Sequence, residues 1–590
     1  DDDCDGAIDN GVTQGCYDGA LGTKGIGVCH PGTESCATGS FGACTGEVTP
    51  SAEQCNGLDD DCNGVVDDPP GGGTLTASCY TGPGGTADIG TCKSGSKTCV
   101  FGALGACTGQ VLPAAHETCG DGLDTDCDGV SDAAEGCLVL DAETRLDAPG
   151  EITGGTQHSY DIALARGGAP LGSNVYAAWS QLVGSTTEVY FRASSDGGNT
   201  WGPIINVTAG ISGNKVKPAL AVAAGAPDRI VVVYQTVAGG VRDIRVQISS
   251  DGGATFGSQS TALDAAGDSF HHVVAIRDTT CVVAWEKLDT GTLNRDVMSR
   301  TSGTGCATFN AETKINVGSG VRFAGRPQVG ITSTSGIVWA WREQRSNSTR
   351  DMFAAAAASP TGAVTEVAID TDATAEADFP VLRVNEGTAY LAWQSVATGT
   401  STGSDVMFTR SSNGGTTWST LRIIDDPAGE VSSSFTPSLA IDPAGAGTGD
   451  DVVAIAWEDR RQGSQVFASV SSDGGTTFAA PVRASSATGA PIAGGTTVPQ
   501  LAAAGGGVLA VAYQNQQPET GARQHVMLAT SIDTGATWTF TEFAVDTGAG
   551  AAILPQVIAS QVGGKPAAVT AWTDFRANQT NGDVYAAVSH

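Results

Sequence analysis

The chain has 590 residues, with 63 acidic and 30 basic side chains and a formal net charge of −33. This length predicts two or more structural units, since one ordinary core does not grow so large. The charge excludes nucleic acid and disfavours an anionic membrane surface as partners, because their phosphates repel it. No apolar run is long enough to span a bilayer.

Cysteine is concentrated at the start of the chain, where 14 of the 16 residues lie between Cys4 and Cys137. Dense, evenly spaced cysteines in Gly-rich sequence predict disulfides, and hence an oxidising, extracellular or cell-surface location. Zinc is the alternative, but the sequence has no CxxC pair and its histidines are scattered.

The first 140 residues contain an internal repeat. Residues 26–67 and 89–132 align almost residue for residue, and the opening DDDCDGAID matches the end of a copy whose beginning we expect upstream. The predicted units are a cysteine-rich metal-binding repeat at 1–58, a second at 59–123, and a third acidic loop with linker at 124–139.

Each copy ends in an acidic loop with side-chain oxygens at positions 1, 3, 5 and 9 and glycine at position 6. This spacing is typical of a Ca²⁺ loop, because alternate residues point inward and glycine permits the sharp turn. Carboxylate oxygens suit hard cations. The alternative is a solvated acidic turn. The predicted metal ligands are Asp1, Asp3, Asp5 and Asp9; Asp59, Asp61, Asn63 and Asp67; and Asp124, Asp126, Asp128, Asp132 and Glu135.

Forward pairing of the loop cysteines leaves no cysteine over. It predicts the disulfides Cys4–Cys16, Cys62–Cys79 and Cys127–Cys137. Two sets of four remain, within each of which three connectivities are open; these are Cys29, Cys36, Cys44 and Cys55, and Cys92, Cys99, Cys107 and Cys119.

The stretch from Glu53 to Gly64, EQCNGLDDDCNG, fits the signature ExCNGxDDDCDGxxD. Residues 1 to about 137 therefore resemble the metal-binding repeats of bacterial surface proteins. That resemblance implies calcium or copper. With four methionines in the whole chain and cysteines expected to be oxidised, we expect Ca²⁺.

From residue 140 onward an aromatic residue recurs inside an apolar strand at steps of 51 to 64 residues. Four-stranded units at this period predict propeller blades. The fold expected for 140–590 is all-β, an eight-bladed β-propeller with seven blades as the alternative, closed by residues near 141–148. The recurring aromatics are Trp179, Tyr234, Trp285, Trp341, Trp393, Trp457, Tyr513 and Trp572.

A second signature, SxDxGxT followed by Trp or Phe, begins at Ser194, Ser249, Ser471 and Ser531, and at Ser411 with Asn in place of Asp. It resembles the Asp-box, or BNR repeat, of sialidase-like propellers, which implies a hairpin-stabilising role. The third copy is degenerate, and we expect a Cys281–Cys306 disulfide to replace its turn.

The sialidase resemblance implies glycoside hydrolysis by a tyrosine–glutamate couple and an arginine triad, but the family's Arg-Ile-Pro motif is absent. We therefore assign no catalytic residue. Arginines nevertheless gather in the second-to-third-strand loops, where they predict either pairs with neighbouring acids such as Glu458, Asp459 and Asp574 or a face for an anionic partner. The candidates are Arg342, Arg345, Arg460, Arg461, Arg523 and Arg576.

These patterns predict an extracellular or cell-surface, non-enzymatic protein. Ca²⁺ stiffens the repeats into a spacer, and the propeller binds glycans or other copies of the chain, the latter building a filament. The alternative is a divergent sialidase-like, glycan-active enzyme.

Overall fold

The computed structural model describes the chain in segments. All regular structure in them is β-strand, and none of them holds a helix suited to crossing a membrane. The chain divides into Asp1–Glu135 and Gly136–His590, here called the repeat unit and the ring unit. The described residues are 11–37, 40–113, 123–124, 127, 129, 141–147, 157–167, 172–257, 262–264, 267–317, 323–345, 349–372, 374–397, 403–425, 433–442, 450–460, 463–485, 498–517, 523–540, 545–546, 551–562, 565–576 and 582–589.

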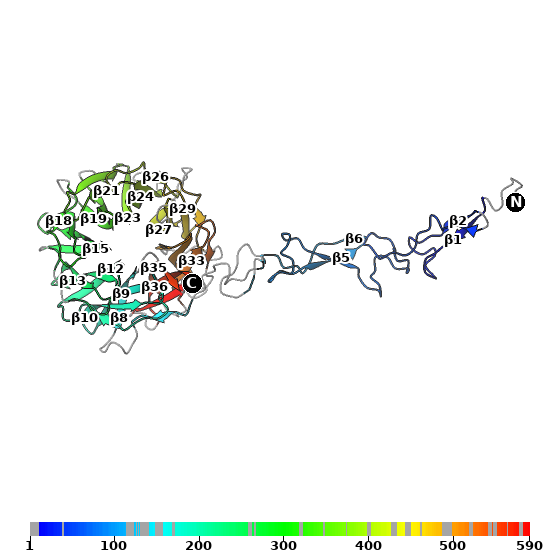
Figure 1. The fold of residues 1–590 in the computed structure, drawn as a ribbon, viewed down its shortest axis with the longest axis horizontal. Coiled ribbons are helices and arrows are strands. Elements are labelled where there is room, and N and C mark those ends of the chain that lie inside the picture. Colours follow the sequence, from blue (N-terminus) through cyan, green and yellow to red (C-terminus); the bar gives the residue numbers. More distant parts are fainter. Residues whose placement is uncertain are drawn as a thin grey trace. The chain divides into compact units, whose positions relative to one another are not determined.

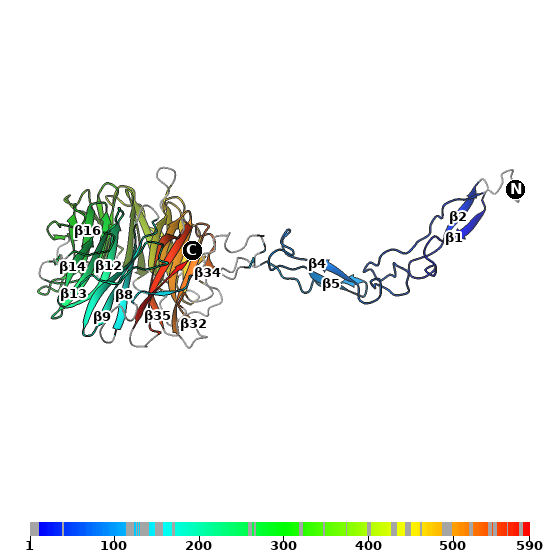
Figure 2. The same ribbon diagram turned by 60° about the horizontal axis from the view of Figure 1, so that its bottom comes forward.

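The repeat unit contains two small antiparallel sheets. The first consists of β1 (Thr13–Cys16), β2 (Gly32–Ala37) and β3 (Ser40–Phe41), and the second of β4 (Thr76–Cys79), β5 (Gly95–Val100) and β6 (Ala103–Leu104) (Figure 2). Within its described residues the only buried apolar side chains are cysteines, whereas most valines and leucines are exposed. Disulfides therefore take the place of a hydrophobic core.

The disulfides follow the repeat. Cys16–Cys44 has its counterpart in Cys79–Cys107, and Cys29–Cys62 in Cys92–Cys127. A fifth bond, Cys55–Cys99, joins one copy to the next. Cys36, the counterpart of Cys99, is free among the described residues.

The forward pairing predicted from the sequence is therefore wrong for Cys16, Cys62, Cys79 and Cys127. Cys62 and Cys127 each bond the first cysteine of their own copy, because the two ends of a copy lie together, as the hydrogen bond from the Val28 N–H to the Asp59 carbonyl shows. Cys4 and Cys137 lie outside the described residues.

The ring unit is built from antiparallel sheets of consecutive strands (Figure 1). The first sheet holds β8 (Gln157–Arg166), β9 (Val175–Val183), β10 (Thr186–Ser194) and β11 (Ile205–Asn206). The second holds β12 (Asn214–Ala223), β13 (Arg229–Ala238) and β14 (Val241–Ser249). An eight-stranded sheet follows, with β15 (Asp268–Arg277), β16 (Thr280–Leu288), β17 (Arg295–Ser302), β18 (Thr313–Lys314), β19 (Phe323–Ile331), β20 (Ile337–Gln344), β21 (Arg350–Ala357) and β22 (Thr365–Asp370).

Four further sheets complete the unit. They are β23 (Ala375–Asn385), β24 (Thr388–Ala397), β25 (Ser404–Ser411) and β26 (Arg422–Ile423); β27 (Ser434–Asp442), β28 (Val452–Asp459), β29 (Gln465–Ser471) and β30 (Val482–Arg483); β31 (Gln500–Gly505), β32 (Val508–Gln517), β33 (Arg523–Ser531) and β34 (Thr539–Phe540); and β35 (Ala552–Val562), β36 (Lys565–Asp574), β37 (Asp583–Ser589) and β7 (Thr144–Arg145).

The sheets close into a ring around an axis, as in a β-propeller (Figure 1). The innermost strands contact one another in the order β8, β12, β15, β19, β23, β27, β31 and β35, and β35 returns to β8. The last sheet takes its outer strand β7 from the start of the unit, with Thr144 opposite Ala586 and Arg145 opposite Tyr585. The sequence places this closing strand near residues 141–148. Closure removes the exposed sheet edges at which other chains would pair.

The recurring aromatics fill the core between the sheets. All of them lie on second strands and are at most 1% exposed. Three stack on an aromatic ring of the third strand, as Trp341 does on Phe353 at 6.0 Å between centroids. Offset stacking of this kind adds to the area that these rings bury.

The Asp-box turns link third to fourth strands and share one hydrogen-bond pattern. In one of them the Ser471 hydroxyl accepts from the Gly475 N–H at 2.8 Å, and Asp473 accepts from the Thr477 N–H at 2.8 Å and from its hydroxyl at 2.6 Å. In the degenerate copy Cys306 takes the place of that glycine with φ 65° and forms a disulfide with Cys281, the pair that the sequence predicts.

Candidate functional site

The acidic loop after Glu53 is held by its own backbone. Asp59 is 5% exposed, and its two carboxylate oxygens accept the N–H groups of Asn63 at 3.1 Å and Gly64 at 3.0 Å. Gly64 has φ 95°, a left-handed conformation that glycine adopts without strain. Asp59 therefore shapes the loop, and its carboxylate is already engaged.

Three other carboxylates converge in this loop. Oxygens of Glu53, Asp61 and Asp68 lie within 4.8 Å of one another, and Asp68 is 4% exposed. Glu53 Oε1 accepts from the Asp61 N–H at 2.8 Å, whereas its Oε2 is buried without a hydrogen-bond partner. Like charges at this separation repel each other, and a bound cation would offset that repulsion. We call Glu53, Asp61 and Asp68 the carboxylate cluster.

The structure separates the predicted ligands of this loop. Asp61 belongs to the carboxylate cluster, while Asp67 accepts the N–H groups of Asn56 at 2.9 Å and Gly57 at 3.0 Å. Asn63 Oδ1 accepts from the Val65 N–H at 2.8 Å, while its Nδ2 donates to Asp61 at 3.1 Å and to Asp68 at 3.2 Å, so Asn63 borders the cluster. Asp59 and Asp67 thus stabilise turns, and the arrangement differs from a loop in which alternate residues all point at one ion.

The other loops are described less fully. Asp124 accepts from the Gly129 N–H at 3.1 Å, as Asp59 does from Gly64, and its Oδ1 is buried without a partner. The remaining predicted ligands, Asp1, Asp3, Asp5, Asp9, Asp126, Asp128, Asp132 and Glu135, lie outside the described residues.

Sequence reasoning missed Glu53 and Asp68 as cluster members. Glu53 is the first residue of the recognised signature, which was the signal available, but it precedes the loop that the spacing defines. Over positions 1, 3, 5, 9 and the one directly after, the two loops carry the same number of carboxylates, although their positions differ. The loop after Glu53 has the neutral Asn63 at position 5 and Asp68 directly after position 9. The third loop has Asp128 at position 5 and Ala133 directly after position 9.

The donor set is chemically hard. Carboxylate oxygens favour Ca²⁺ or Mg²⁺ over copper or zinc, which prefer sulfur and imidazole. The nearby cysteines offer no thiolate, because Cys55 is bonded to Cys99 and Cys62 to Cys29.

The predicted arginine face consists of ion-paired side chains where it is described. Arg345 bonds Glu343 and Glu366, both at 2.8 Å, and its guanidinium lies 3.8 Å from the centroid of Phe353. Arg576 repeats this arrangement with Asp574 at 2.6 Å, Glu143 and the ring of Tyr585. Arg460 bonds Glu458 at 2.6 Å and Arg342 bonds Asp378 at 3.1 Å. The side chain of Arg523 and all of Arg461 lie outside the description.

These pairs clamp the second-to-third-strand loops. Glu343 and Asp574 are fully buried and also accept from the indole N–H of Trp341 at 3.0 Å and Trp572 at 3.3 Å. Of the two alternatives in the sequence analysis, the pairing of arginines with acidic side chains therefore describes these residues, and their charges are largely compensated.

A row of strained residues encircles the axis. In or next to each innermost strand, one non-glycine residue has a positive φ of 39° to 56°. The residue that follows it in the sequence is buried and is usually a proline. A β-bulge accompanies most of them and re-aims the side chain. The row, here called the axial rim, comprises Asp161, Lys217, His271, Arg326, Phe379, Thr436, Val498 and Leu554.

The rim is polar on one side and largely apolar on the other, and its densest cluster surrounds Asp378. Arg326, Arg342 and Arg350 approach this carboxylate at 2.9, 3.1 and 3.2 Å. Arg326 also lies 4.0 Å from the centroid of Phe379. Burial lowers the pKa of Arg342, although the charge of Asp378 opposes this shift.

A second acid group adjoins this cluster. Glu286, 2% exposed, accepts from the Arg326 N–H at 2.7 Å and lies 2.7 Å from Nδ1 of the exposed His271. Strained, partly exposed residues beside buried charges are characteristic of ligand-binding places.

Two segments of the repeat unit match a family model. Residues 50–68 and 109–133 match Cu-binding_MopE, described as "Putative metal-binding motif". The first segment contains the whole carboxylate cluster.

No curated protein matches the chain. Among solved structures, an α-L-arabinofuranosidase from Fusarium graminearum has 12% identity over 66% of this chain and 98% of its own, with a TM-score of 0.37. A Hadza microbial sialidase has 12% identity over 72% of each chain and a TM-score of 0.34. A protein of unknown function from Dyadobacter fermentans has 12% identity over 76% of this chain and 99% of its own, with a TM-score of 0.35. Likenesses of this size carry no argument about activity.

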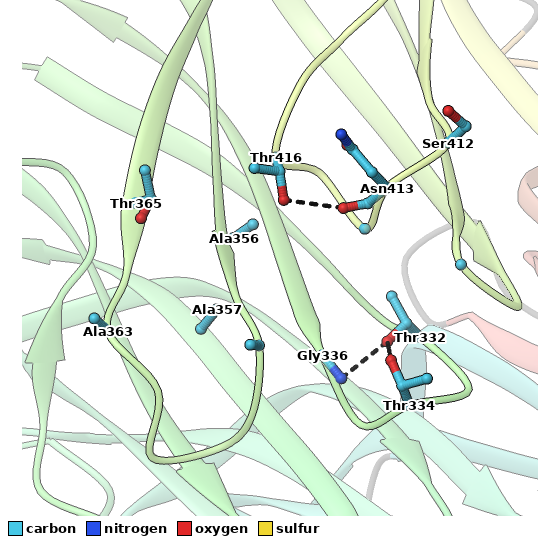
Figure 3. A pocket seen from close by; sticks show the side chains of 13 residues that line it. Thr332, Thr334, Gly336, Ala356, Ala357, Ala363, Thr365, Ser412, Asn413 and Thr416 are labelled. Carbon is cyan, nitrogen blue, oxygen red and sulfur yellow. Dashed lines mark hydrogen bonds between the residues drawn. The ribbon is translucent and has the colours of Figure 1, made fainter.

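A cavity of about 450 Å³ lies beside the Asp-box turn at Asn413 (Figure 3). Its walls are threonines, alanines and glycines, and the polar atoms of its turns bond one another, as Gly336 N–H does with Thr332 Oγ1 at 2.9 Å. No ionisable side chain lines it. It therefore offers no general acid, base or nucleophile with a shifted pKa.

Proposed function

We propose that this chain is an extracellular or cell-surface, non-enzymatic protein. Ca²⁺ stabilises its repeats as a spacer, and an eight-bladed propeller is its binding module, with acidic glycans as the ligands. Disulfides in both units support an oxidising location.

The carboxylate cluster carries the metal assignment. Three carboxylates share one site, and one of their oxygens is buried with no donor to satisfy it. A doubly charged cation with oxygen ligands satisfies that atom and removes the repulsion. The cluster contains no histidine or methionine, the neutral side chains that bind copper, and this composition favours Ca²⁺.

The closed order of innermost strands supports eight blades. Each of these strands begins a group of antiparallel strands, and the eight-stranded sheet divides into two such groups. Among the described residues a single parallel pair, Arg295 with Phe323, connects β17 to β19. The recurring aromatic residue also occurs once in each group.

The axial rim supports the binding role. Lys217 and His271 are exposed and Arg326 is partly exposed, while Phe379 and Leu554 provide apolar surface in the same row. Sugars present both C–H faces and anionic or hydroxyl groups, which suits such a mixed rim. Glu286 already accepts from the Arg326 N–H, and Asp378 accepts from Arg342 and Arg350, which supports binding without hydrolysis.

Chelation tests the proposal. The full chain is digested with a nonspecific protease in the presence of calcium and after removal of calcium with a chelator. We expect new cleavage within residues 50–68 on chelation, reversed by calcium and not by copper, with the ring unit unchanged. Equal cleavage in both states contradicts the calcium role. Binding of acidic glycans is measured separately, with Arg326→Gln expected to weaken it and Arg410→Gln, in the ring unit but outside the rim, as the control.

A second function is favoured by one observation. Glu286, which pairs with His271, accepts from the backbone N–H of Arg326, one of the three arginines around Asp378, and an enzyme acting on an acidic glycan also needs carboxylates near cationic groups. Turnover of an acidic glycoside that is lost in Glu286→Gln would establish this alternative.

A further inference from the structure

A cavity of about 350 Å³ lies on the axis of the ring unit. Its walls come only from innermost strands, namely β8, β23, β27, β31 and β35. Most of the lining is small or apolar, and it includes Ala440, Leu501 and Ile558. No carboxylate lines it. Such a cavity alone holds water or an apolar group.

Two arginines project from this lining. Arg166 belongs to β8 and Arg383 to β23, strands that lie on opposite sides of the ring (Figure 1). Neither has a carboxylate partner among the described residues, unlike most other arginines of the ring unit. The Nη1 atom of Arg166 is buried without a hydrogen-bond partner, and Arg383 donates to the carbonyl of Leu382 at 3.0 Å.

The two arginines differ in burial. Arg166 is half-buried, and this burial lowers the pKa of its guanidinium, whereas Arg383 is exposed where it lines the cavity. A partly buried cation without a counter-charge costs free energy, which an anion in the cavity offsets. Guanidinium forks bind planar or tetrahedral oxyanions through paired N–H donors.

We propose that the axial cavity is a binding site for a small oxyanion, a carboxylate, sulfate or phosphate group, held by Arg166 and Arg383. The site is distinct from the axial rim and from the carboxylate cluster, and it does not rest on the proposed function. The volume exceeds that of one such group, since a water molecule occupies about 30 Å³ in the liquid. The anion therefore enters with part of its hydration shell or as the head of a small organic acid whose body contacts the apolar wall.

Calorimetric titration of the full chain with sodium sulfate in low-salt buffer tests the site. We expect one saturable site per chain, weakened at least tenfold in Arg166→Gln and in Arg383→Gln. Arg277→Gln is the matched control, because Arg277 also lies on an innermost strand but is paired with Glu386 at 3.0 Å; it should bind sulfate as the wild type does. Absence of saturable binding, or equal affinity in all variants, overturns the proposal.

Melting temperatures, measured by thermal unfolding, distinguish a variant that has lost the anion site from one that fails to fold. Without sulfate, Arg166→Gln should melt at or above the wild-type temperature, because a partly buried, unpaired cation has been removed. With sulfate, only the wild type and Arg277→Gln should gain stability. Selenate replaces sulfate in crystals to locate the anion by anomalous scattering. A peak between Arg166 and Arg383 supports the site, and binding solely elsewhere overturns it.

Discussion

Replacement of Glu53 by glutamine should change the repeat unit in opposite directions with and without metal. Glutamine keeps an oxygen that can accept from the Asp61 N–H, so the turn is preserved while one charge is lost. Without metal, this loss relieves repulsion from Asp61 and Asp68. With Ca²⁺, it removes one of three carboxylates from the ion.

The magnitude follows from the separation. Two unit charges with oxygens at most 4.8 Å apart repel by about 1 kcal/mol in a water-like medium and about 3 kcal/mol at an effective dielectric constant of 20. Glu53 and Asp61 are partly exposed, so the lower figure applies, less screening by salt. Two pairs involve Glu53, and after screening its neutralisation should stabilise the metal-free loop by about 1 kcal/mol.

Hydrogen exchange of the Asn63 and Gly64 amides, which bond Asp59, reports this stability locally. In Glu53→Gln these amides should exchange more slowly than in the wild type when calcium is absent. They should lose most of the protection that calcium adds, with calcium affinity at least tenfold weaker. Asp60→Asn is the matched control, since Asp60 lies in the same loop outside the cluster. Unchanged calcium affinity in Glu53→Gln, or an equal loss in Asp60→Asn, would refute the reasoning.

Three further predictions concern the ring unit. Cys281→Ser opens a loop of 25 residues and should destabilise the unit by about 3 kcal/mol, measured by thermal unfolding; an unchanged melting temperature would show that the disulfide adds nothing to the degenerate turn. Both Gly474 and Gly475 have a positive φ that strains alanine, but Gly475→Ala should destabilise more, because a Cβ at 475 lies 2.7 Å from the Phe408 ring, whereas one at 474 lies 3.0 Å from the end of Arg410 and 3.4 Å from Asp450; equal losses would contradict the packing. Burial lowers the pKa of His272 to about 4, below the usual 6.5. Between these values the unfolded chain binds more protons than the folded chain, so the free energy of unfolding should fall as the pH drops from about 6.5 to 4. His272→Gln should flatten this part of a profile of denaturation against pH, and an unchanged profile would contradict the role of His272.

Local and periodic features could be predicted from the sequence. The recurring Trp and Tyr mark second strands because each packs in the same place in its sheet, and the Asp-box turns follow from residues within eight positions of one another. Closure by residues near 144 could be predicted because that segment resembles the outer strands of other copies.

Features that join distant segments of the chain could not be predicted from the sequence. Cys55–Cys99 links two copies, which pairing by sequence order does not consider. The carboxylate cluster combines Glu53, which precedes the loop, with Asp68, which follows its last predicted ligand. Arg576 pairs with Glu143, which lies 433 residues earlier in the chain. The positive φ values of the axial rim accompany bulges in the innermost strands, and the residues that adopt them share no chemical type, although a proline usually follows.

Anomalous diffraction at a wavelength where calcium scatters strongly, from crystals of the full chain in millimolar Ca²⁺, tests the metal assignment most directly. We predict a peak among the oxygens of Glu53, Asp61 and Asp68. A cluster without a peak at this concentration, or a peak at Asp59 and Asp67 instead, would contradict it.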